Sequence, residues 1–331
     1  MRSDRFIRLS SFLLVIALCA ACGGQGAPVA KEANKPAAAP ETATAPAGDA
    51  PAALAPFPDP PRGPHKTAIE EGVAFGSFNG FPLLMHIERP DPLPEKPMPV
   101  VIWLHGGGWY MGNASPTPNR FLAEHGFFTA SVEYRSSYES KFPAQIHDVK
   151  AAVRWLRTNA EKLHIDPERI GVWGHSAGGH LAVLLGTSGD VAELEGDLGP
   201  TGLSSRVQAV VNLAGVIDME HPRTEQWQEK ERLLLFGGPQ EEHADLVRLA
   251  SPVIFLDADD PPVLTIHGTK DPNVPLHHSS YLHEKLKGAG VESEIRLLEG
   301  KDHWLVQYPA MPVEPEVKAL TLAFFQKHLA Q

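Results

Sequence analysis

The residues with the clearest chemical potential lie in the pentapeptide Gly174–Gly178 (GHSAG), which has the spacing G-x-S-x-G. A serine in this pattern occupies a tight turn between a strand and a helix, and the flanking glycines remove side chains that would clash there. The turn presents the hydroxyl above the carboxyl edge of a sheet, where it can attack a carbonyl carbon. A purely structural turn is the alternative, so the interpretation depends on the elements around Ser176. We predict that Ser176 is a nucleophile.

A glycine-rich loop, His105–Trp109 (HGGGW), is the second chemical feature. Acyl transfer passes through a tetrahedral oxyanion, and removing one of the N–H donors that stabilise it typically costs about 3–4 kcal/mol. Successive glycines let the backbone approach a substrate closely and point its amides inward. A phosphate-binding turn is the alternative, but a G-x-G-x-x-G pattern is absent and no P-loop lysine follows. The loop is therefore predicted to stabilise an oxyanion.

Short apolar runs alternate with amphipathic stretches from about Thr67 onward, and these predict the elements that position both features. Val100–Leu104 precedes the glycine loop and Ile170–Trp173 precedes the serine turn, each as a strand buried on both faces. Further strands are expected at Ala68–Gly76, Pro82–Glu88, Phe127–Tyr134, Val207–Leu213, Val263–Ile266 and Glu294–Leu298. Helices are expected over Gln145–Glu161, from the serine turn through Leu185, and over Glu314–His328. This alternation predicts an α/β fold: one domain over residues 67–331, with a mostly parallel central sheet and helices on both faces.

Together, His105–Trp109 and Gly174–Gly179 resemble the hormone-sensitive-lipase and feruloyl-esterase (BD-FAE) branch of the α/β hydrolases. Further matching stretches are Asp148–Arg157, Ile165–Leu181, Asp260–Pro275 and Glu299–Trp304, so the similarity covers nearly all of residues 67–330. The resemblance implies the α/β-hydrolase fold. It also implies that the amides of Gly107 and Gly108 donate to the oxyanion, and that the amide of Ala177 completes the oxyanion hole.

The resemblance further implies an acid and a base, since hydrolases of this fold carry serine, acid and histidine in that chain order. Asp271 lies on the loop after the strand Val263–Ile266, and His303 follows the strand Glu294–Leu298. Both positions resemble the acid and base positions of the family. His303 is expected to take the serine proton and later pass it to the leaving alcohol, while Asp271 fixes its tautomer and stabilises the imidazolium.

Other titratable residues near these loops have simpler interpretations. His267, before a glycine at a strand end, is predicted to be a packed residue, and His175 flanks the nucleophile as a variable residue. Asp302 is too close in sequence to orient the ring of its neighbour His303. Some rivals follow Asp271 too soon or precede the strand and so lie at the wrong sheet edge: His277, His278, Asp257, Asp259 and Asp260.

Two aromatic residues beside the glycine loop, Trp109 and Tyr110, are expected to line the substrate pocket, and packing among surface helices is the alternative. The acidic, Gly-rich stretch Thr187–Ser205 and the charged, largely helical stretch Met219–Ala250 could cover the serine.

The composition excludes several other classes of function. The net charge is -11 with no basic stripe, which argues against a nucleic-acid partner. No H-E-x-x-H or similar cluster is present, so neither a metal nor a cofactor is implied. Both cysteines, Cys19 and Cys22, lie near the N-terminus, so the folded body is expected to contain no disulfide.

The N-terminus resembles a bacterial lipoprotein signal peptide over residues 1–22. Three arginines precede an apolar run that is shorter than the roughly 20 residues a bilayer-spanning helix needs. The run ends in Leu18–Gly23 (LCAACG), which resembles a lipobox with Cys22 at the lipidated position. Cys19 departs from the aliphatic residue usual at its position. Ordinary cleavage near Ala21, giving a periplasmic or secreted protein, is the alternative.

Residues 23–66 are rich in Ala, Pro, Gly and Thr and have almost no large apolar side chains. Such a stretch cannot bury enough surface to offset its ordering entropy, so it is predicted to be a disordered tether. We therefore expect an exported protein, lipid-anchored to the cell envelope. Gly23 after the lipidated cysteine favours the outer membrane, by analogy with lipoprotein sorting.

These features together predict a serine carboxylesterase that hydrolyses small acyl esters through an acyl-enzyme, with acetyl or feruloyl groups on carbohydrate as candidate substrates. An arylformamidase-like amidase or a peptidase with the same triad is an alternative. A non-catalytic binding module is a further alternative, but such modules usually lose a triad member or the glycine loop.

Overall fold

The computed structural model describes residues 60–220, 226–307 and 312–330. The predicted signal peptide, Cys22 and most of the predicted tether lie outside these residues. No helix among the described residues is long and apolar enough to cross a membrane.

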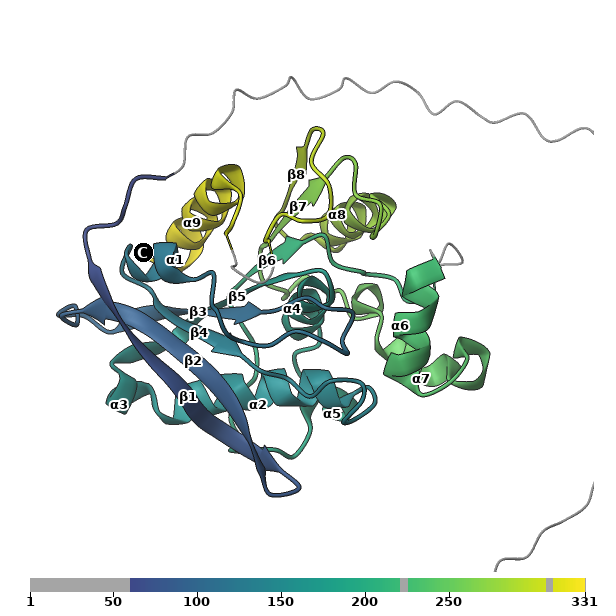
Figure 1. Cartoon of the computed structure of the whole chain (residues 1–331), viewed down its shortest axis with the longest axis horizontal. Helices are drawn as coiled ribbons and strands as arrows, with labels where there is room; N and C mark the ends of the chain where they lie inside the picture. The colour runs from purple at the N-terminus through teal and green to yellow at the C-terminus, as the bar shows by residue number, and fades with distance from the viewer. Residues whose placement is uncertain (1–59, 221–225, 308–311, 331) are drawn as a thin grey trace, which may run out of the picture. The chain divides into compact units, whose positions relative to one another are not determined.

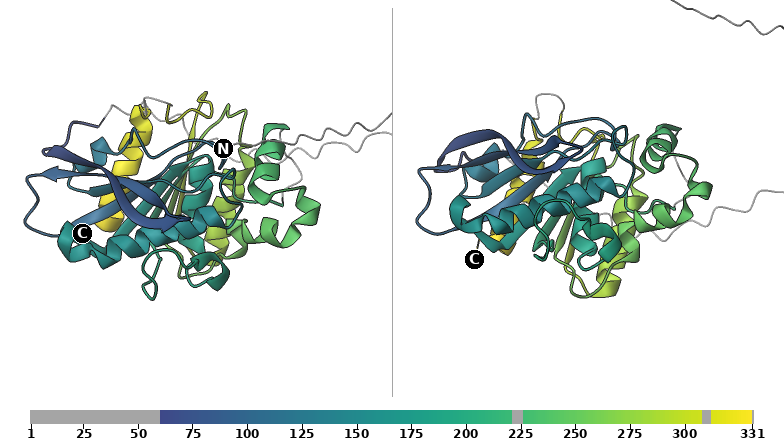
Figure 2. Two further views of the ribbon diagram at one scale, coloured as in Figure 1. Left: turned by 60° about the horizontal axis from the view of Figure 1, so that its bottom comes forward. Right: turned by 90° about the horizontal axis from the view of Figure 1, so that it is seen from below.

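The described residues form an eight-stranded sheet with the strand order β1-β2-β4-β3-β5-β6-β7-β8 (Figure 1). The strands are β1 (Lys66–Phe78), β2 (Phe81–Asp91), β3 (Met98–Leu104), β4 (Phe128–Val132), β5 (Ile165–His175), β6 (Ala209–Leu213), β7 (Val263–Gly268) and β8 (Ser293–Leu298). β1 pairs antiparallel with β2, and β2 pairs antiparallel with β4. All pairs from β4 through β8 are parallel. Figure 2 shows β1 and β2 as a ribbon at one edge of the sheet.

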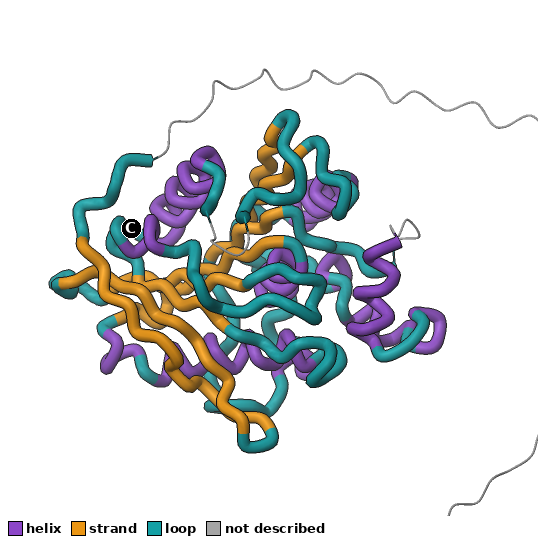
Figure 3. Tube along the Cα trace, viewed as in Figure 1, coloured by secondary structure: helices purple, strands orange, loops and turns teal. Residues whose placement is uncertain are grey.

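The helices occupy both faces of this sheet. They are α1 (Arg120–Ala123), α2 (Ala144–Thr158), α3 (Ala160–Leu163), α4 (Ala177–Thr187), α5 (Ala192–Glu195), α6 (Gln226–Phe236), α7 (Ala244–Leu249), α8 (His277–Ala289) and α9 (Pro315–Leu329), with 3-10 turns η1 (Gln240–Glu242) and η2 (Pro252–Ile254). α2, α4 and α8 pack on one face, whereas α1 and α9 pack on the other. α6 and α7 lie beside the sheet, toward the carboxyl ends of β3 and β4 (Figures 1 and 3).

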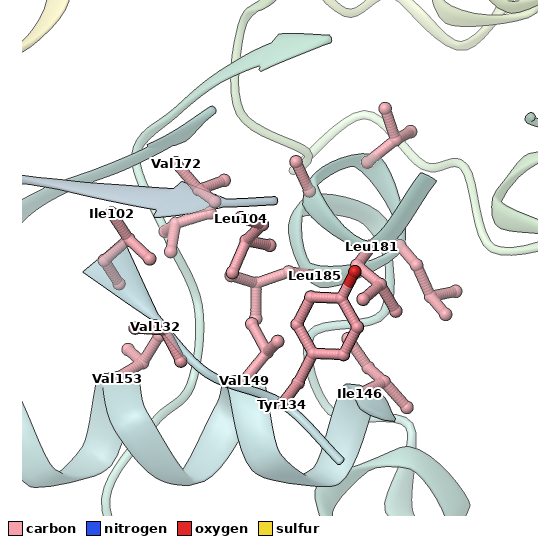
Figure 4. Close-up of a cluster of buried hydrophobic side chains, with 14 of the residues drawn as sticks. Ile102, Leu104, Val132, Tyr134, Ile146, Val149, Val153, Val172, Leu181 and Leu185 are labelled. Atoms are coloured by element: carbon pink, nitrogen blue, oxygen red, sulfur yellow. The ribbon is translucent and has the colours of Figure 1, made fainter. Parts of the chain in front are cut away.

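The alternation of side chains along each strand divides the core into two clusters. In β3, Ile102 and Leu104 point toward the α2 and α4 face, while Val101 and Trp103 point toward the α1 and α9 face. The first cluster joins strand residues such as Val172 to helix residues such as Leu181 and Val149, shown in Figure 4. A strand buried on both faces reads as a continuous apolar run, which is why the sequence identified β3.

The predicted fold class, a mostly parallel sheet with helices on both faces, is confirmed. Most predicted boundaries differ from the observed ones by one to three residues, and two elements differ more. β5 begins at Ile165 rather than Ile170, because Ile165 pairs with Met98 across an irregularity in the β3 ladder. The single helix expected over Gln145–Glu161 is two helices, interrupted at Asn159, whose side-chain amide donates back to the carbonyl of Trp155.

Candidate active site

Ser176 occupies the junction between β5 and α4 with φ 56° and ψ −118°, a conformation that L-residues rarely adopt. Its backbone N–H donates to the carbonyl of Leu213 at 2.8 Å, which ties the turn to β6. A Cβ at Gly178 would overlap the carbonyl oxygen of Leu104, so only glycine allows α4 to approach β3 this closely. The local sequence therefore places Ser176 at the carboxyl edge of the sheet and at the first turn of a helix.

The glycine loop follows β3 and lies beside the serine. A Cβ at Gly106 would be 3.3 Å from the Cβ of Ser176. Gly107 and Gly108 have φ angles of 115° and 58°. Residues with a side chain rarely adopt these backbone conformations, so glycine allows the orientation of the amides in this loop. Tyr134 lies two residues after the end of β4, and its hydroxyl donates to the carbonyl of His105 at 2.7 Å, which holds the start of the loop.

The structure brings Asp271 and His303 together from the loops after β7 and β8. His303 Nδ1 donates to Asp271 Oδ2 at 2.6 Å, and both side chains are buried. Asp271 Oδ1 accepts from the backbone N–H groups of Asn273 and Val274 at 2.7 and 2.9 Å. Burial alone would raise the pKa of Asp271, but the hydrogen bonds from His267 and His303 outweigh it and hold that pKa below its ordinary value. The carboxylate is therefore ionised and accepts only.

His267 is a site residue that the sequence interpretation assigned to packing alone. It is fully buried, and its Nε2 donates to Asp271 Oδ2 at 3.0 Å, so two imidazoles share one carboxylate oxygen. Its Nδ1 accepts from the Ser279 hydroxyl at 2.6 Å, which sets the tautomer. Its place four residues before Asp271 at the end of β7 was the available signal.

His175 also contacts the base. Its Nε2 donates to the backbone carbonyl of His303 at 2.7 Å, and the two rings are 4.7 Å apart. Burial lowers the pKa of His175 to about 3, and the neighbouring His303 makes a smaller contribution in the same direction. The imidazole is therefore neutral at physiological pH and acts as a fixed donor that links the serine turn to the loop carrying His303.

Ser176 and His303 line one cavity of about 440 Å³, together with the glycine loop. Tyr110 lines this cavity, in agreement with its predicted position. The prediction for Trp109 is wrong: it is not among the residues that line the cavity in the described part of the chain. With φ 62°, its side chain turns into the core, where Nε1 donates to His180 Nδ1 at 3.0 Å. Packing against α4 therefore overrides its proximity in sequence to the glycine loop.

Glu231 of α6 is a second residue missed by the sequence interpretation. It lines the cavity, it is 5% exposed, and a Cβ at Gly108 would approach its Cγ to 2.5 Å. Burial and then the charge and hydrogen bond of Glu231 raise the pKa of Tyr110. This places a carboxylate beside the glycine loop. The sequence contained one signal for Glu231. It lies within Met219–Ala250, the stretch that is expected to cover the serine.

Within the described ranges, no group of three or more His, Cys, Asp or Glu side chains could hold a metal ion. The chemical groups that the site presents are a serine hydroxyl, imidazoles, carboxylates and backbone amides.

The strand order, the helix layers and the loops that meet at the carboxyl edge define the α/β-hydrolase fold. The sequence model of the BD-FAE family matches residues 85–286, which is more than half of the chain. The chain belongs to the BD-FAE family.

Comparisons with individual proteins agree with this assignment. Esterase LipC of Mycobacterium tuberculosis is 31% identical over 256 residues, which cover 74% of this chain and 62% of LipC. A truncated carbohydrate esterase from gut microbiota is 29% identical with a TM-score of 0.71, covering 82% of this chain and all of that one. An acetyl ester-xyloside bifunctional hydrolase from Caldicellulosiruptor lactoaceticus is 28% identical with a TM-score of 0.64, covering 75% of this chain and 89% of that one. The chain spans less than two thirds of the length of LipC.

Proposed function

We propose that this protein is a serine carboxylesterase with Ser176 as nucleophile, His303 as base and Asp271 as the acid that orients it. The single observation that carries this proposal is the 2.6 Å hydrogen bond between His303 and Asp271, with His303 and Ser176 on the walls of one cavity. This arrangement comes from three loops that are far apart in sequence.

The geometry supports a two-step reaction. His303 Nε2 takes the proton of the Ser176 hydroxyl as its oxygen attacks the ester carbonyl, and Nδ1 stays bonded to Asp271. The amides of Gly107, Gly108 and Ala177 stabilise the oxyanion that forms. The alcohol leaves with the proton from the imidazolium. His303 then takes a proton from a water molecule that attacks the acyl-enzyme, the bond between the acyl group and Ser176 breaks, and the imidazolium returns the proton to the serine oxygen as the carboxylic acid leaves.

The substrates proposed are small acyl esters, with acetyl or feruloyl groups on carbohydrate as the favoured class. A cavity of about 440 Å³ suits a short acyl group with part of its alcohol. Two structural relatives are named a carbohydrate esterase and an acetyl ester-xyloside hydrolase, which supports the carbohydrate half of the proposal.

The test is hydrolysis of p-nitrophenyl acetate by the full-length protein and its Ser176→Ala variant. We expect kcat/KM to fall at least about a thousandfold, since the nucleophile is removed. Ser204→Ala, which changes an exposed serine, is the matched control and should keep full activity.

A fluorophosphonate probe adds a second measurement, because it labels an activated serine directly. Labelling of Ser176 with turnover of esters in preference to matched anilides supports the proposal. Preference for the anilides would indicate an amidase, and an unreactive Ser176 would indicate a binding module.

We also propose that the protein is exported and anchored to the cell envelope through lipidated Cys22. The lipobox-like LCAACG and the Ala/Pro-rich stretch of residues 23–66 support this proposal. Two or more acyl chains give a stable anchor where one gives marginal binding.

A further inference from the structure

Trp304 is an exposed aromatic residue next to the proposed base. Half of its surface is accessible, whereas the neighbouring His303 is buried. It lines the catalytic cavity. A tryptophan side chain is large and mostly apolar, so its exposure to water loses the free energy that its burial would contribute to folding. Its exposure at the mouth of a cavity therefore points to contact with a ligand.

The main chain holds Trp304 in this exposed position. Its backbone N–H donates to Asp302 Oδ1 at 2.9 Å. Its ring forms a T-shaped contact with the His303 ring, with the two ring centroids 5.7 Å apart. Leu305, the next residue, is buried in the α9 side of the core, and its N–H donates to the carbonyl of His303 at 2.9 Å. Because both neighbours are anchored inward, the indole is presented to solvent as a preorganised surface.

Trp304 also borders a polar groove of about 490 Å³. Its walls are formed by Lys301, Asp302, Gln307 and Glu314, and Trp304 belongs to both this groove and the catalytic cavity. Lys301 Nζ and Glu314 form an exposed ion pair at 2.8 Å. The groove therefore offers both donors and acceptors within reach of the indole.

We propose that Trp304 is a specificity-determining residue that stacks on a sugar ring of the alcohol half of the substrate, with the polar groove receiving the next sugar. Sugar rings have an apolar C–H face and a rim of hydroxyls, which matches an aromatic surface bordered by charged and amide side chains. The preferred substrate is then an acylated oligosaccharide rather than an ester of a simple alcohol. This inference rests on the esterase function proposed above.

The experiment compares mono-acetylated xylotetraose with ethyl acetate, which has no ring to stack. Trp304→Ala should raise KM for the oligosaccharide at least tenfold with little change in kcat, and should lower kcat/KM for the oligosaccharide at least tenfold more than kcat/KM for ethyl acetate. Trp304→Phe should show a smaller increase in KM, because an aromatic face remains. Leu297→Ala, which removes an exposed apolar side chain from β8, is the control and should match wild type on both substrates.

Binding of unesterified xylotetraose, measured by calorimetry on the full-length protein, tests the stacking site without catalysis. Wild type and Ser176→Ala should bind it, and Trp304→Ala should bind at least tenfold more weakly. Equal losses on both esters would mean that Trp304 supports His303 rather than the sugar, and would overturn the inference. So would unchanged kinetics and binding, or a wild type that cleaves ethyl acetate but ignores the saccharide. If no ester is cleaved and no probe labels Ser176, the esterase proposal fails, and calorimetry decides the sugar site separately.

Discussion

Asp271 is held in the candidate site by four hydrogen bonds to its carboxylate. Its Oδ2 accepts from both His303 and His267, and its Oδ1 accepts from two backbone amides, so all the donors face an ionised carboxylate. Hydrogen bonds to charged groups contribute about 1.5–3 kcal/mol each, roughly twice as much as neutral ones. His267 therefore acts through Asp271, as a positioning residue.

Replacing His267 with Phe should lower kcat/KM by about 10–100-fold, the loss expected when one charge-assisted hydrogen bond is removed. The pKa of Asp271 should rise because one of the bonds that lower it is gone. Asp271 should then take a proton at a higher pH than in wild type. Steady-state kinetics measures the first effect, and the chemical shift of the Asp271 carboxyl carbon, followed by NMR during a pH titration, measures the second.

His267→Gln retains a donor group and should recover part of the lost activity. A uniform loss of activity in both variants, with an unchanged titration of Asp271, would mean that His267 serves only packing.

At the scale of elements, strand β7 places similar carboxylates in opposite environments at its two ends. Asp271, beyond the carboxyl end, is surrounded by donors and has a lowered pKa. Asp260, before the amino end, is buried; burial raises its pKa to about 7, with neighbouring aspartates adding to the effect. The direction of the strand therefore separates the aspartate that contacts His303 from the aspartate buried at the opposite edge of the sheet.

Asp260→Asn should stabilise the protein at alkaline pH. The folded-state pKa of about 7 lies above the ordinary aspartate value, so the contribution of this group is fully favourable below about pH 4 and is lost as pH rises through 7. Asparagine stays neutral, and the free energy of unfolding at pH 8 should increase by about 1–3 kcal/mol. Urea denaturation at pH 4, 6 and 8 measures this.

The exposed Asp197→Asn is the control and should change stability little at any pH. A gain for Asp260→Asn that is independent of pH would contradict the burial argument.

At the scale of the whole molecule, the cavity lined by Ser176 adjoins two grooves. It shares Trp304 with one groove, and it shares Ser115 and Pro116 with another of about 510 Å³ beside β1 and β2. Two grooves next to one cavity would suit the long hydroxylated alcohol of the proposed substrate. The proposed lipid anchor at Cys22 would keep the protein at the cell envelope.

Cys22→Ser should move the protein from the membrane fraction to the soluble fraction of bacterial cells, because no acyl chain can be attached. Cys19→Ser is the matched control and should stay with the membrane. Fractionation followed by mass spectrometry of the mature N-terminus measures both. Equal distribution of the two variants, or an unmodified wild-type N-terminus, would exclude the anchor.

Features that depend on neighbouring residues were predictable from the sequence. The G-x-S-x-G turn, the glycine loop and the buried strand before each are encoded locally, because backbone conformation and strand burial follow from residue types in short windows. The placement of Asp271 and His303 at one edge was also predictable, since the carboxyl ends of parallel strands meet there. The 2.6 Å contact between these two residues follows from that topology.

The directions of individual side chains were decided only by the tertiary structure. Trp109 follows the glycine loop directly, yet it points into the core because α4 supplies His180 as its partner. His267 and Glu231 belong to the site because β7 and α6, which are distant in sequence from Ser176, pack beside it. Packing between elements that are distant in sequence decides such contacts, so the spacing of residues along the chain cannot predict them.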